Sequence, residues 1–355
     1  MMEIPFGRGE RMVYNASAPR GRAVLVRPHC SWRSACDPDE TGRGRASERA
    51  GCPVAVDRRG AFAAMRGLES DGVVTIRILC VGDVVGRPGR GVLADHLKDF
   101  IQQRDVELVV CNAENAAGGS GLTPAIFNKL LDYGVDAVTL GDHVYRKKEV
   151  IQVLESSDRI VRPANLLSSA AGRRWIVVPT KSGRFQVGVT CVLGQMFMGC
   201  WDSPWPAVDR ALNEMPAEVK IRVVDFHADA SSEKVAMGWY LNGRVSVVFG
   251  THTHVPTADA RVLDKGTAYI SDTGMTGPYD SVLGRRKDRV LKSLTTSMPQ
   301  YFEVATGDPR MCAVLAEVSP DTGKALSIER IDVHGRIHEG GPYDADDGRP
   351  QKAGD

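Results

Sequence analysis

The stretch from residue 76 to residue 112, IRILCVGDVVGRPGRGVLADHLKDFIQQRDVELVVCN, decides the fold class. It opens with a near-continuous apolar run, residues 76–82, which is typical of a strand buried on both faces. Apolar residues then recur at helical spacing across residues 91–103, and residues 106–112 form a second apolar run. A strand, a helix and a strand in this order predict a parallel βαβ unit of an α/β domain.

The alternation continues beyond this unit. The glycine-rich loop AAGGSGL precedes a helix that Thr123 and Pro124 open, and a strand is expected at residues 136–140. Further strands are expected at residues 186–193, 221–226, 245–249, 268–271, 311–318 and 327–333. Because the later half carries more strands and fewer helices, the pattern favours a mixed, two-sheet sandwich over a simple doubly wound sheet.

Composition excludes several classes of protein. The 355 residues contain 45 Lys plus Arg against 44 Asp plus Glu, so neither a strongly basic nucleic-acid coat nor an acidic tail describes the whole chain. No window holds the roughly 18 apolar residues of a membrane span, and the first residues do not resemble a signal peptide, so a cytoplasmic protein is expected. The eight cysteines are scattered without a Cys-x-x-Cys pair, which disfavours thiolate metal sites and disulfides.

Residues 1–72 differ in composition from the rest. They contain twelve Arg and no Lys, are rich in Gly, Ser and Pro, and show no sustained apolar period. We expect a disordered or poorly ordered Arg-rich extension there. It is read either as an accessory extension or as the product of a start codon assigned too early, with Met65 as an alternative start; a nucleic-acid arm is the weaker reading.

Side chains suited to metal binding or proton transfer follow five predicted strands. They are Asp83, Glu114, Asn115, Asp142, His143, His227, His252 and His254. Taken singly, each has an ordinary explanation, such as a helix cap or a turn. The chain has eight histidines, and four of them lie at predicted strand ends. That coincidence is harder to explain in this way. His252 and His254 lie two residues apart, so an extended backbone would direct both imidazoles to the same side.

These groups point to a metal site with two ions. Imidazole nitrogens together with carboxylate and amide oxygens suit Mn, Fe, Zn or Co better than Ca or Mg. Eight groups exceed what one ion uses, and a carboxylate such as Glu114 can bridge two ions roughly 3.5–4 Å apart. Such a pair activates a hydroxide for attack on phosphorus, so the implied reaction is phosphoester hydrolysis. The sequence lacks the spacings of a dinucleotide fold, a P-loop and a Gly-x-Ser-x-Gly nucleophile.

Six segments together resemble the YmdB-like branch of the calcineurin-like metallophosphoesterases, in matching order and spacing across residues 76–333. They are GDVVGRPGR, NAENAAGGSGLT, VRPAN, DFHAD, GTHTHVPTAD and GTAYISDTGMTGPYDSVLG. The resemblance implies a four-layer α/β/β/α sandwich. The metallophosphoesterase domain would then span residues 73–335, followed by a flexible tail at 336–355.

The resemblance also implies a dinuclear site. One metal would be held by Asp83, Glu114, Asn115 and His254, and the other by Glu114, Asp142, His227 and His252, with Glu114 bridging. His143 would protonate the leaving oxygen. Members of this family resemble phosphodiesterases of cyclic nucleotides, 2′,3′-cyclic and also 3′,5′-cyclic, in which a metal-bound hydroxide attacks. Iron or manganese is expected, with zinc or cobalt as alternatives.

One departure from the family leaves alternatives open. The family usually has Asn-His where this chain has Asp142-His143, which adds a negative charge beside an anionic substrate. A regulatory metal- or nucleotide-binding protein with weak catalysis is therefore a second reading, and an RNA-directed metallonuclease a third. The loop at residues 194–206, rich in Met and Trp, either stacks on a base or covers the core or a subunit contact. A homo-oligomer is expected from size alone.

Overall fold

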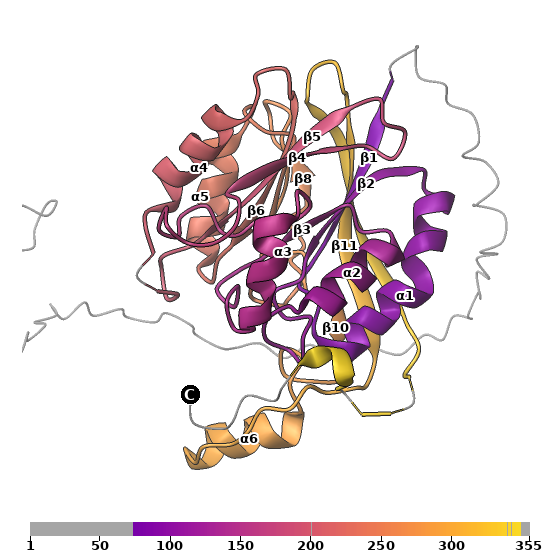
Figure 1. The fold of residues 1–355 in the computed structure, drawn as a ribbon, viewed down its shortest axis with the longest axis vertical. Coiled ribbons are helices and arrows are strands. Elements are labelled where there is room, and N and C mark those ends of the chain that lie inside the picture. The colour runs from indigo at the N-terminus through magenta and orange to yellow at the C-terminus, as the bar shows by residue number, and fades with distance from the viewer. Residues whose placement is uncertain (1–73, 200, 339, 342, 349–355) are drawn as a thin grey trace, which may run out of the picture. The chain divides into compact units, whose positions relative to one another are not determined.

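The computed structural model describes residues 74–199, 201–338, 340, 341 and 343–348, all within the unit Glu69–Asp355 (Figure 1). The expected Arg-rich extension, residues 1–72, lies outside the described residues. Among the residues that are described, no helix is both long enough and apolar enough to cross a membrane.

The first sheet has six strands, of which β1 (Ile76–Val81), β2 (Val106–Asn112) and β3 (Ala137–Thr139) run parallel. The others are β10 (Gly277–Pro278), β11 (Pro309–Val318) and β12 (Ala325–His334), and the order is β10-β11-β1-β2-β3 with β12 also on β11. β1 is parallel to β2 and β2 to β3, with Asn112 opposite Thr139. β11 pairs antiparallel with both β1 and β12.

The second sheet also has six strands, in the order β4-β5-β6-β7-β9-β8. They are β4 (Trp175–Pro179), β5 (Gln186–Leu193), β6 (Ile221–His227), β7 (Val247–Thr251), β8 (Arg261–Val262) and β9 (Ala268–Ile270). β5, β6, β7 and β9 run parallel, and His227 at the end of β6 lies opposite Thr251 at the end of β7. Parallel strands of both sheets therefore present their carboxyl ends to one edge, where ligand sites form in such sheets.

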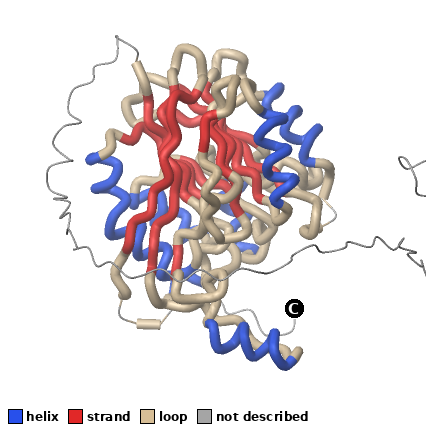
Figure 2. The backbone as a smooth tube through the Cα atoms, turned by 180° about the vertical axis from the view of Figure 1, so that it is seen from behind, coloured by secondary structure: helices blue, strands red, loops and turns tan. Residues whose placement is uncertain are grey.

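Helices cover the outer face of each sheet. α1 (Gly86–Gln103), α2 (Pro124–Tyr133), η1 (Lys148–Val150) and α3 (Ile151–Ser156) pack on the first sheet, while α4 (Pro204–Glu214) and α5 (Ser231–Leu241) pack on the second (Figures 1 and 2). Alternating side chains of β1 explain the layers: Leu79 faces the helices, and Ile78 faces Val223 and Phe249 of the other sheet. The predicted α/β/β/α sandwich is confirmed.

Several predicted elements differ from the structure by one or more residues, and α1 and β7 are two examples. α1 begins at Gly86 instead of residue 91. Pro88 is tolerated there because it lies in the first turn, where a backbone N–H has no partner within the helix. β7 ends at Thr251, two residues beyond the predicted strand, because its pairing with β6 continues to that residue. α4, α5 and α6 (Lys287–Thr296) give the later half more helix than its sequence indicates.

Described residues of the segment after β12, where a flexible tail is predicted, contact two helices. A 3₁₀ turn, η2 (Ala345–Asp347), lies against α1 and α2, and Asp347 is only 5% exposed. Arg90 of α1 forms ion pairs with Asp344 and Asp347, at 2.7 and 2.8 Å. These ion pairs join residues that are distant in sequence, and no local apolar pattern predicts them.

Candidate metal centre

Four side chains of types that can ligate a metal converge at the shared edge. The ligand atoms of Glu114, Asp142, His227 and His252 all lie within 4.8 Å of one another. His227 Nε2 is 3.1 Å from Asp142 Oδ1 and 3.3 Å from Glu114 Oε1. His252 Nδ1 is 3.0 Å from the same His227 nitrogen. The set of four matches one of the two ligand groups expected from the sequence.

The three other expected ligands, Asp83, Asn115 and His254, lie close to one another and to Glu114. Asp83 Oδ1 is 3.9 Å from His254 Nε2, and Asn115 Nδ2 is 3.2 Å from the same nitrogen and 3.0 Å from Glu114 Oε1. A 180° rotation of an amide exchanges its nitrogen and oxygen, so Asn115 can also present its oxygen there. His254 Nδ1 is 3.1 Å from the Leu283 carbonyl, and donating a proton to it leaves Nε2 as the ligand atom.

The local structure fits a divalent cation. Asp83 is 0% exposed, and its Oδ1 atom accepts no hydrogen bond from the described residues. Gly141 leaves space that any side chain would fill, because a Cβ there would overlap with Glu114 Oε2 and His227 Nε2. The donors are imidazole nitrogens and carboxylate oxygens, which suit first-row divalent metals. The cluster can therefore hold metal.

The pKa values show how charge is balanced in this cluster. Burial raises the pKa of Asp83. Burial also opposes ionisation of Glu114, but His227 and His143 lower its pKa to about 2. Burial opposes the charged form of His227 as well, yet Glu114 and Asp142 raise its pKa well above the usual range. A proton on His227 thus balances clustered carboxylates, and a bound cation would replace it.

The backbone at His252 and His254 corrects one expectation. The two residues have φ values of 94° and 64°, so they lie in left-handed conformation and not in an extended strand. The turn is held from both sides: Asp83 Oδ2 accepts the His252 N–H at 3.0 Å, and Asp272 Oδ2 accepts the Thr253 N–H at 3.1 Å. The two imidazoles consequently face different ligand groups, His252 toward His227 and His254 toward Asp83.

A buried carboxylate behind the ligands was not singled out from the sequence. Asp225 accepts hydrogen bonds from Asn112 Nδ2 at 2.9 Å, Thr139 Oγ1 at 2.5 Å and Thr251 Oγ1 at 2.6 Å. Burial raises the pKa of Asp225 to about 6. Thr251 Oγ1 is also 2.8 Å from His227 Nδ1, so the network fixes the ring whose Nε2 faces the cluster. The signal was available, since residues 225 and 227 share one face of a strand.

His143 lies at the open side of the cluster, with its side chain 26% exposed. Its backbone N–H donates to Glu114 Oε2 at 3.0 Å, and its Nδ1 is 2.7 Å from Asn115 Oδ1. Its Nε2 is 3.7 Å from Asp142 Oδ2. The structure thus brings all eight expected side chains together, while their roles stay predictions.

The model of the YmdB-like protein family matches residues 79–331. The chain belongs to this family. The YmdB-like chain is 40% identical over 256 residues to the 2′,3′-cyclic-nucleotide 2′-phosphodiesterase of Bacillus subtilis (strain 168), with 72% of the chain and 96% of the relative aligned.

Two solved structures share the YmdB-like fold. A crystal structure of a hypothetical protein from Thermus thermophilus matches with a TM-score of 0.68 at 39% identity, covering 74% of this chain and all of that one. A crystal structure of a novel phosphatase from Mycoplasma pneumoniae matches with a TM-score of 0.69 at 30% identity, covering 74% and 94%.

Proposed function

We propose that the chain is a phosphodiesterase that hydrolyses 2′,3′-cyclic nucleotides with two divalent metal ions, iron or manganese before zinc or cobalt. The observation that carries the proposal is the cluster of Glu114, Asp142, His227 and His252. It occurs in a chain 40% identical to a relative named for this activity. The second proposed ion would be held by Asp83, Asn115 and His254, with Glu114 shared between both.

In the proposed reaction, the oxygen of water adds to phosphorus, the P–O2′ bond breaks, and O2′ takes a proton to give a nucleoside 3′-phosphate. When bound, two divalent ions supply positive charge for the phosphoryl oxygens and lower the pKa of the attacking water. His143 is the proposed proton donor. Its Nδ1 is 2.7 Å from the Asn115 amide, which leaves Nε2 as the nitrogen that can transfer a proton.

A hollow beside the cluster supports a small substrate. It has a volume of about 250 Å³ and is lined by Asp142, Val144, Tyr145, Arg146, Leu166, Leu193 and Trp201. Ligand pockets commonly span roughly 300–1,000 Å³, so this hollow suits one part of a nucleotide, such as its base. In the loop whose role the sequence left open, Trp201 lines the hollow and Trp205 packs on Tyr240, with ring centroids 5.2 Å apart.

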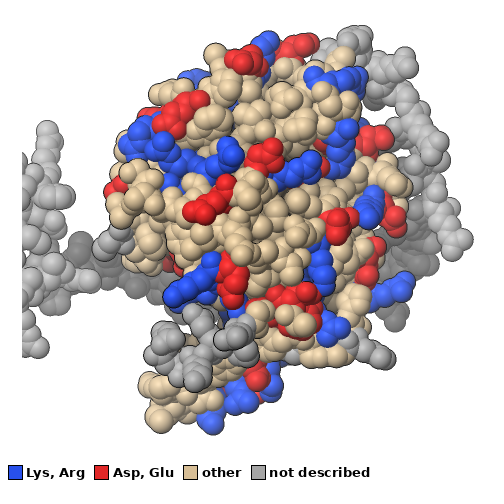
Figure 3. Space-filling model, in the orientation of Figure 1, with Lys and Arg blue, Asp and Glu red and all other residues tan. Residues whose placement is uncertain are grey.

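Surface charge favours a small phosphodiester over RNA. Lys and Arg side chains are interspersed with Asp and Glu across the face drawn in Figure 3. The net charge of the chain is +1. Grooves that bind RNA gather positive charge, because neutralising phosphates supplies most of the affinity. A cytoplasmic location and a homo-oligomeric state stay predictions.

The direct test is hydrolysis by the purified full chain with added manganese. We expect 2′,3′-cyclic AMP to yield 3′-AMP, measured by chromatography, and bis(p-nitrophenyl) phosphate to be cleaved. Chelation should abolish both reactions and manganese should restore them. A parallel assay with 3′,5′-cyclic AMP measures the breadth of the specificity. Two bound manganese ions per chain without hydrolysis of any substrate would contradict the proposal and favour the regulatory reading.

Asp142→Asn is expected to raise kcat and weaken metal binding. The carboxylate adds negative charge near an anionic substrate, and an amide would remove that charge and offer a donor to a phosphoryl oxygen. We expect a rise in kcat of about 10-fold at saturating manganese, below the roughly 100-fold that one well-aligned donor contributes. Asp158→Asn, at an exposed position, is the control. Unchanged or lower kcat in Asp142→Asn would count against this reading.

A further inference from the structure

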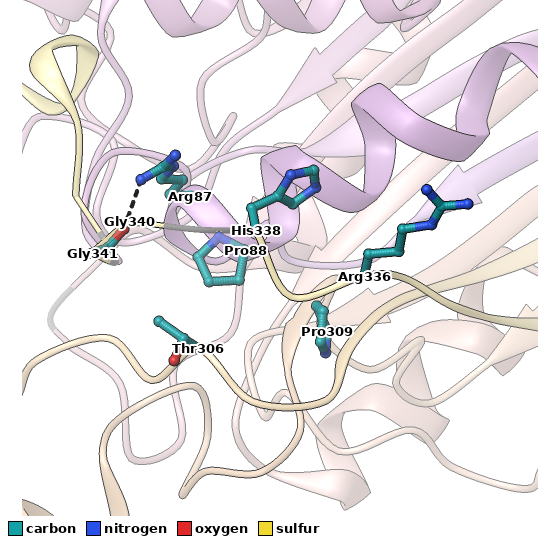
Figure 4. Close-up of a pocket in the computed structure, with 8 residues that line it drawn as sticks. All are labelled: Arg87, Pro88, Thr306, Pro309, Arg336, His338, Gly340 and Gly341. Atoms are coloured by element: carbon teal, nitrogen blue, oxygen red, sulfur yellow. Dashed lines mark hydrogen bonds between the residues drawn. The ribbon is translucent and has the colours of Figure 1, made fainter.

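The chain continues past the residues matched by the family model and crosses α1. The match ends at residue 331, and described residues after β12 contact the helix. His338 Nε2 lies 3.0 Å from Asp95 Oδ2, and Arg87 donates to the Gly341 carbonyl at 3.0 Å (Figure 4). Figure 4 shows His338, Gly340 and Gly341 beside Arg87 and Pro88 at the start of α1. The segment thus reaches the end of α1 that is nearest the metal centre.

Beyond this crossing, η2 fixes two carboxylates relative to each other. Asp344 caps the turn by accepting the Asp346 N–H at 3.1 Å, and Asp347 Oδ2 accepts the Asp344 N–H at 2.7 Å. Thr123 at the start of α2 donates to the Asp346 carbonyl at 2.7 Å. The turn is therefore docked as a unit, with both carboxylates facing α1.

Arg90 of α1 receives these carboxylates. Its side chain is 4% exposed, and both of its ion-pair partners among the described residues, Asp344 and Asp347, come from this segment. Its guanidinium also donates to the Ala116 carbonyl in the glycine-rich loop. A buried cation without a partner is strongly unfavourable, so Arg90 depends on the segment for its counter-charge.

Asp347 also holds the loop that follows two proposed ligands. Its Oδ1 accepts the Gly118 N–H at 2.8 Å, alongside the bond from Arg90. The loop returns to the site, because Gly121 N–H donates to the Glu114 carbonyl at 2.5 Å. Gly118, Gly119 and Gly121 have φ values of 59°, 85° and 89°, a left-handed run that lacks side chains to order it. An outside contact at Gly118 therefore limits the freedom of the backbone that carries Glu114 and Asn115.

We propose that Asp347 is a positioning residue of the metal centre, which it acts on through Arg90 and the loop at residues 116–121. The expected effect of Asp347 on catalysis rests on the proposed function. Asp347 contacts none of the proposed ligand side chains. It fixes the Ala116–Gly118 backbone through one shared oxygen, and so fixes the neighbouring Glu114 and Asn115.

Two variants of the full chain test the proposal. Asp347→Ala removes both the charge facing Arg90 and the acceptor for Gly118, whereas Asp347→Asn keeps an oxygen for Gly118. Groups that orient metal ligands contribute about 10–100-fold to metal affinity, so we expect the manganese Kd of Asp347→Ala to rise about 10-fold. Amide exchange in the peptide covering 116–121 should accelerate, and kcat for 2′,3′-cyclic AMP should fall with little change in KM. Asp347→Asn should lie between Asp347→Ala and wild type.

Asp346→Ala is the matched control, since Asp346 lies in the same turn and its carboxylate pairs with Lys129 of α2, away from the loop. It should keep wild-type manganese affinity. Wild-type manganese affinity and loop exchange in Asp347→Ala would overturn the proposal, even if its melting temperature fell. Should Asp347→Ala not fold, the same two measurements on Asp347→Asn decide. A wild-type chain without hydrolytic activity would refute the proposed function alone, because manganese affinity and amide exchange need no turnover.

Discussion

Glu114→Gln is expected to lower kcat on 2′,3′-cyclic AMP by well over 100-fold and to reduce the number of bound manganese ions. Both oxygens of Glu114 accept hydrogen bonds, Oε1 from Asn115 Nδ2 at 3.0 Å and Oε2 from the His143 N–H at 3.0 Å. A glutamine amide has one acceptor, so in either orientation its NH₂ group faces another donor. Groups that only orient a ligand already contribute about 10–100-fold, and a bridging ligand should contribute more.

Glu107→Gln is the matched control for this variant. It makes the same substitution near the start of β2, the strand that Glu114 follows, where Glu107 accepts the Ser182 N–H at 3.0 Å. We expect wild-type kinetics and two manganese ions per chain, counted by elemental analysis. If Glu114→Gln also kept two ions and wild-type kcat, Glu114 would not be the bridging ligand and the assignment of both metal positions would have to change.

The sequence could indicate where these candidate side chains gather, because the proposed ligands follow parallel strands. Asp83, Glu114 and Asp142 each come within three residues of a strand end, and the carboxyl ends of parallel strands share an edge. The pattern did not specify that two separate sheets contribute to one cluster. Nor did it reveal the left-handed turn at His252 and His254, because that turn depends on Asp83 and Asp272, which are distant in sequence.

The segment after β12 makes contacts that its own sequence pattern does not predict. Residues 336–348 are rich in Gly and Asp and have no apolar period, which is typical of a flexible tail. The described residues among them contact distant parts of the chain, as Asp347 contacts Arg90, 257 residues away. An ion pair over that separation leaves no local signal. The predicted strands, in contrast, carried their own apolar runs, and β5, for which residues 186–193 were expected, has the bounds Gln186–Leu193.

Gly141→Ala is expected to weaken manganese binding at least as much as the loss of a ligand. The φ of Gly141 lies outside the left-handed region, so alanine is compatible with the backbone and any effect comes from contacts. A Cβ would overlap with Glu114 Oε2 and His227 Nε2, and one or both groups must move. Neither side chain can turn to solvent, because Glu114 is 1% and His227 0% exposed.

The expected result is a manganese Kd raised by roughly 100-fold or more, measured by titration calorimetry. Overpacking a tight site costs about 1–3 kcal/mol of the free energy of unfolding, so the variant should fold with a lowered melting temperature. Gly341→Ala is the control, since a Cβ at that glycine has nothing within 4 Å. Wild-type affinity in Gly141→Ala would mean that Glu114 and His227 can separate by the width of a methyl group and still bind metal. The close approach of these ligand atoms would then reflect only the attraction between His227 and the carboxylates around it. Gly141 would have no role beyond the turn.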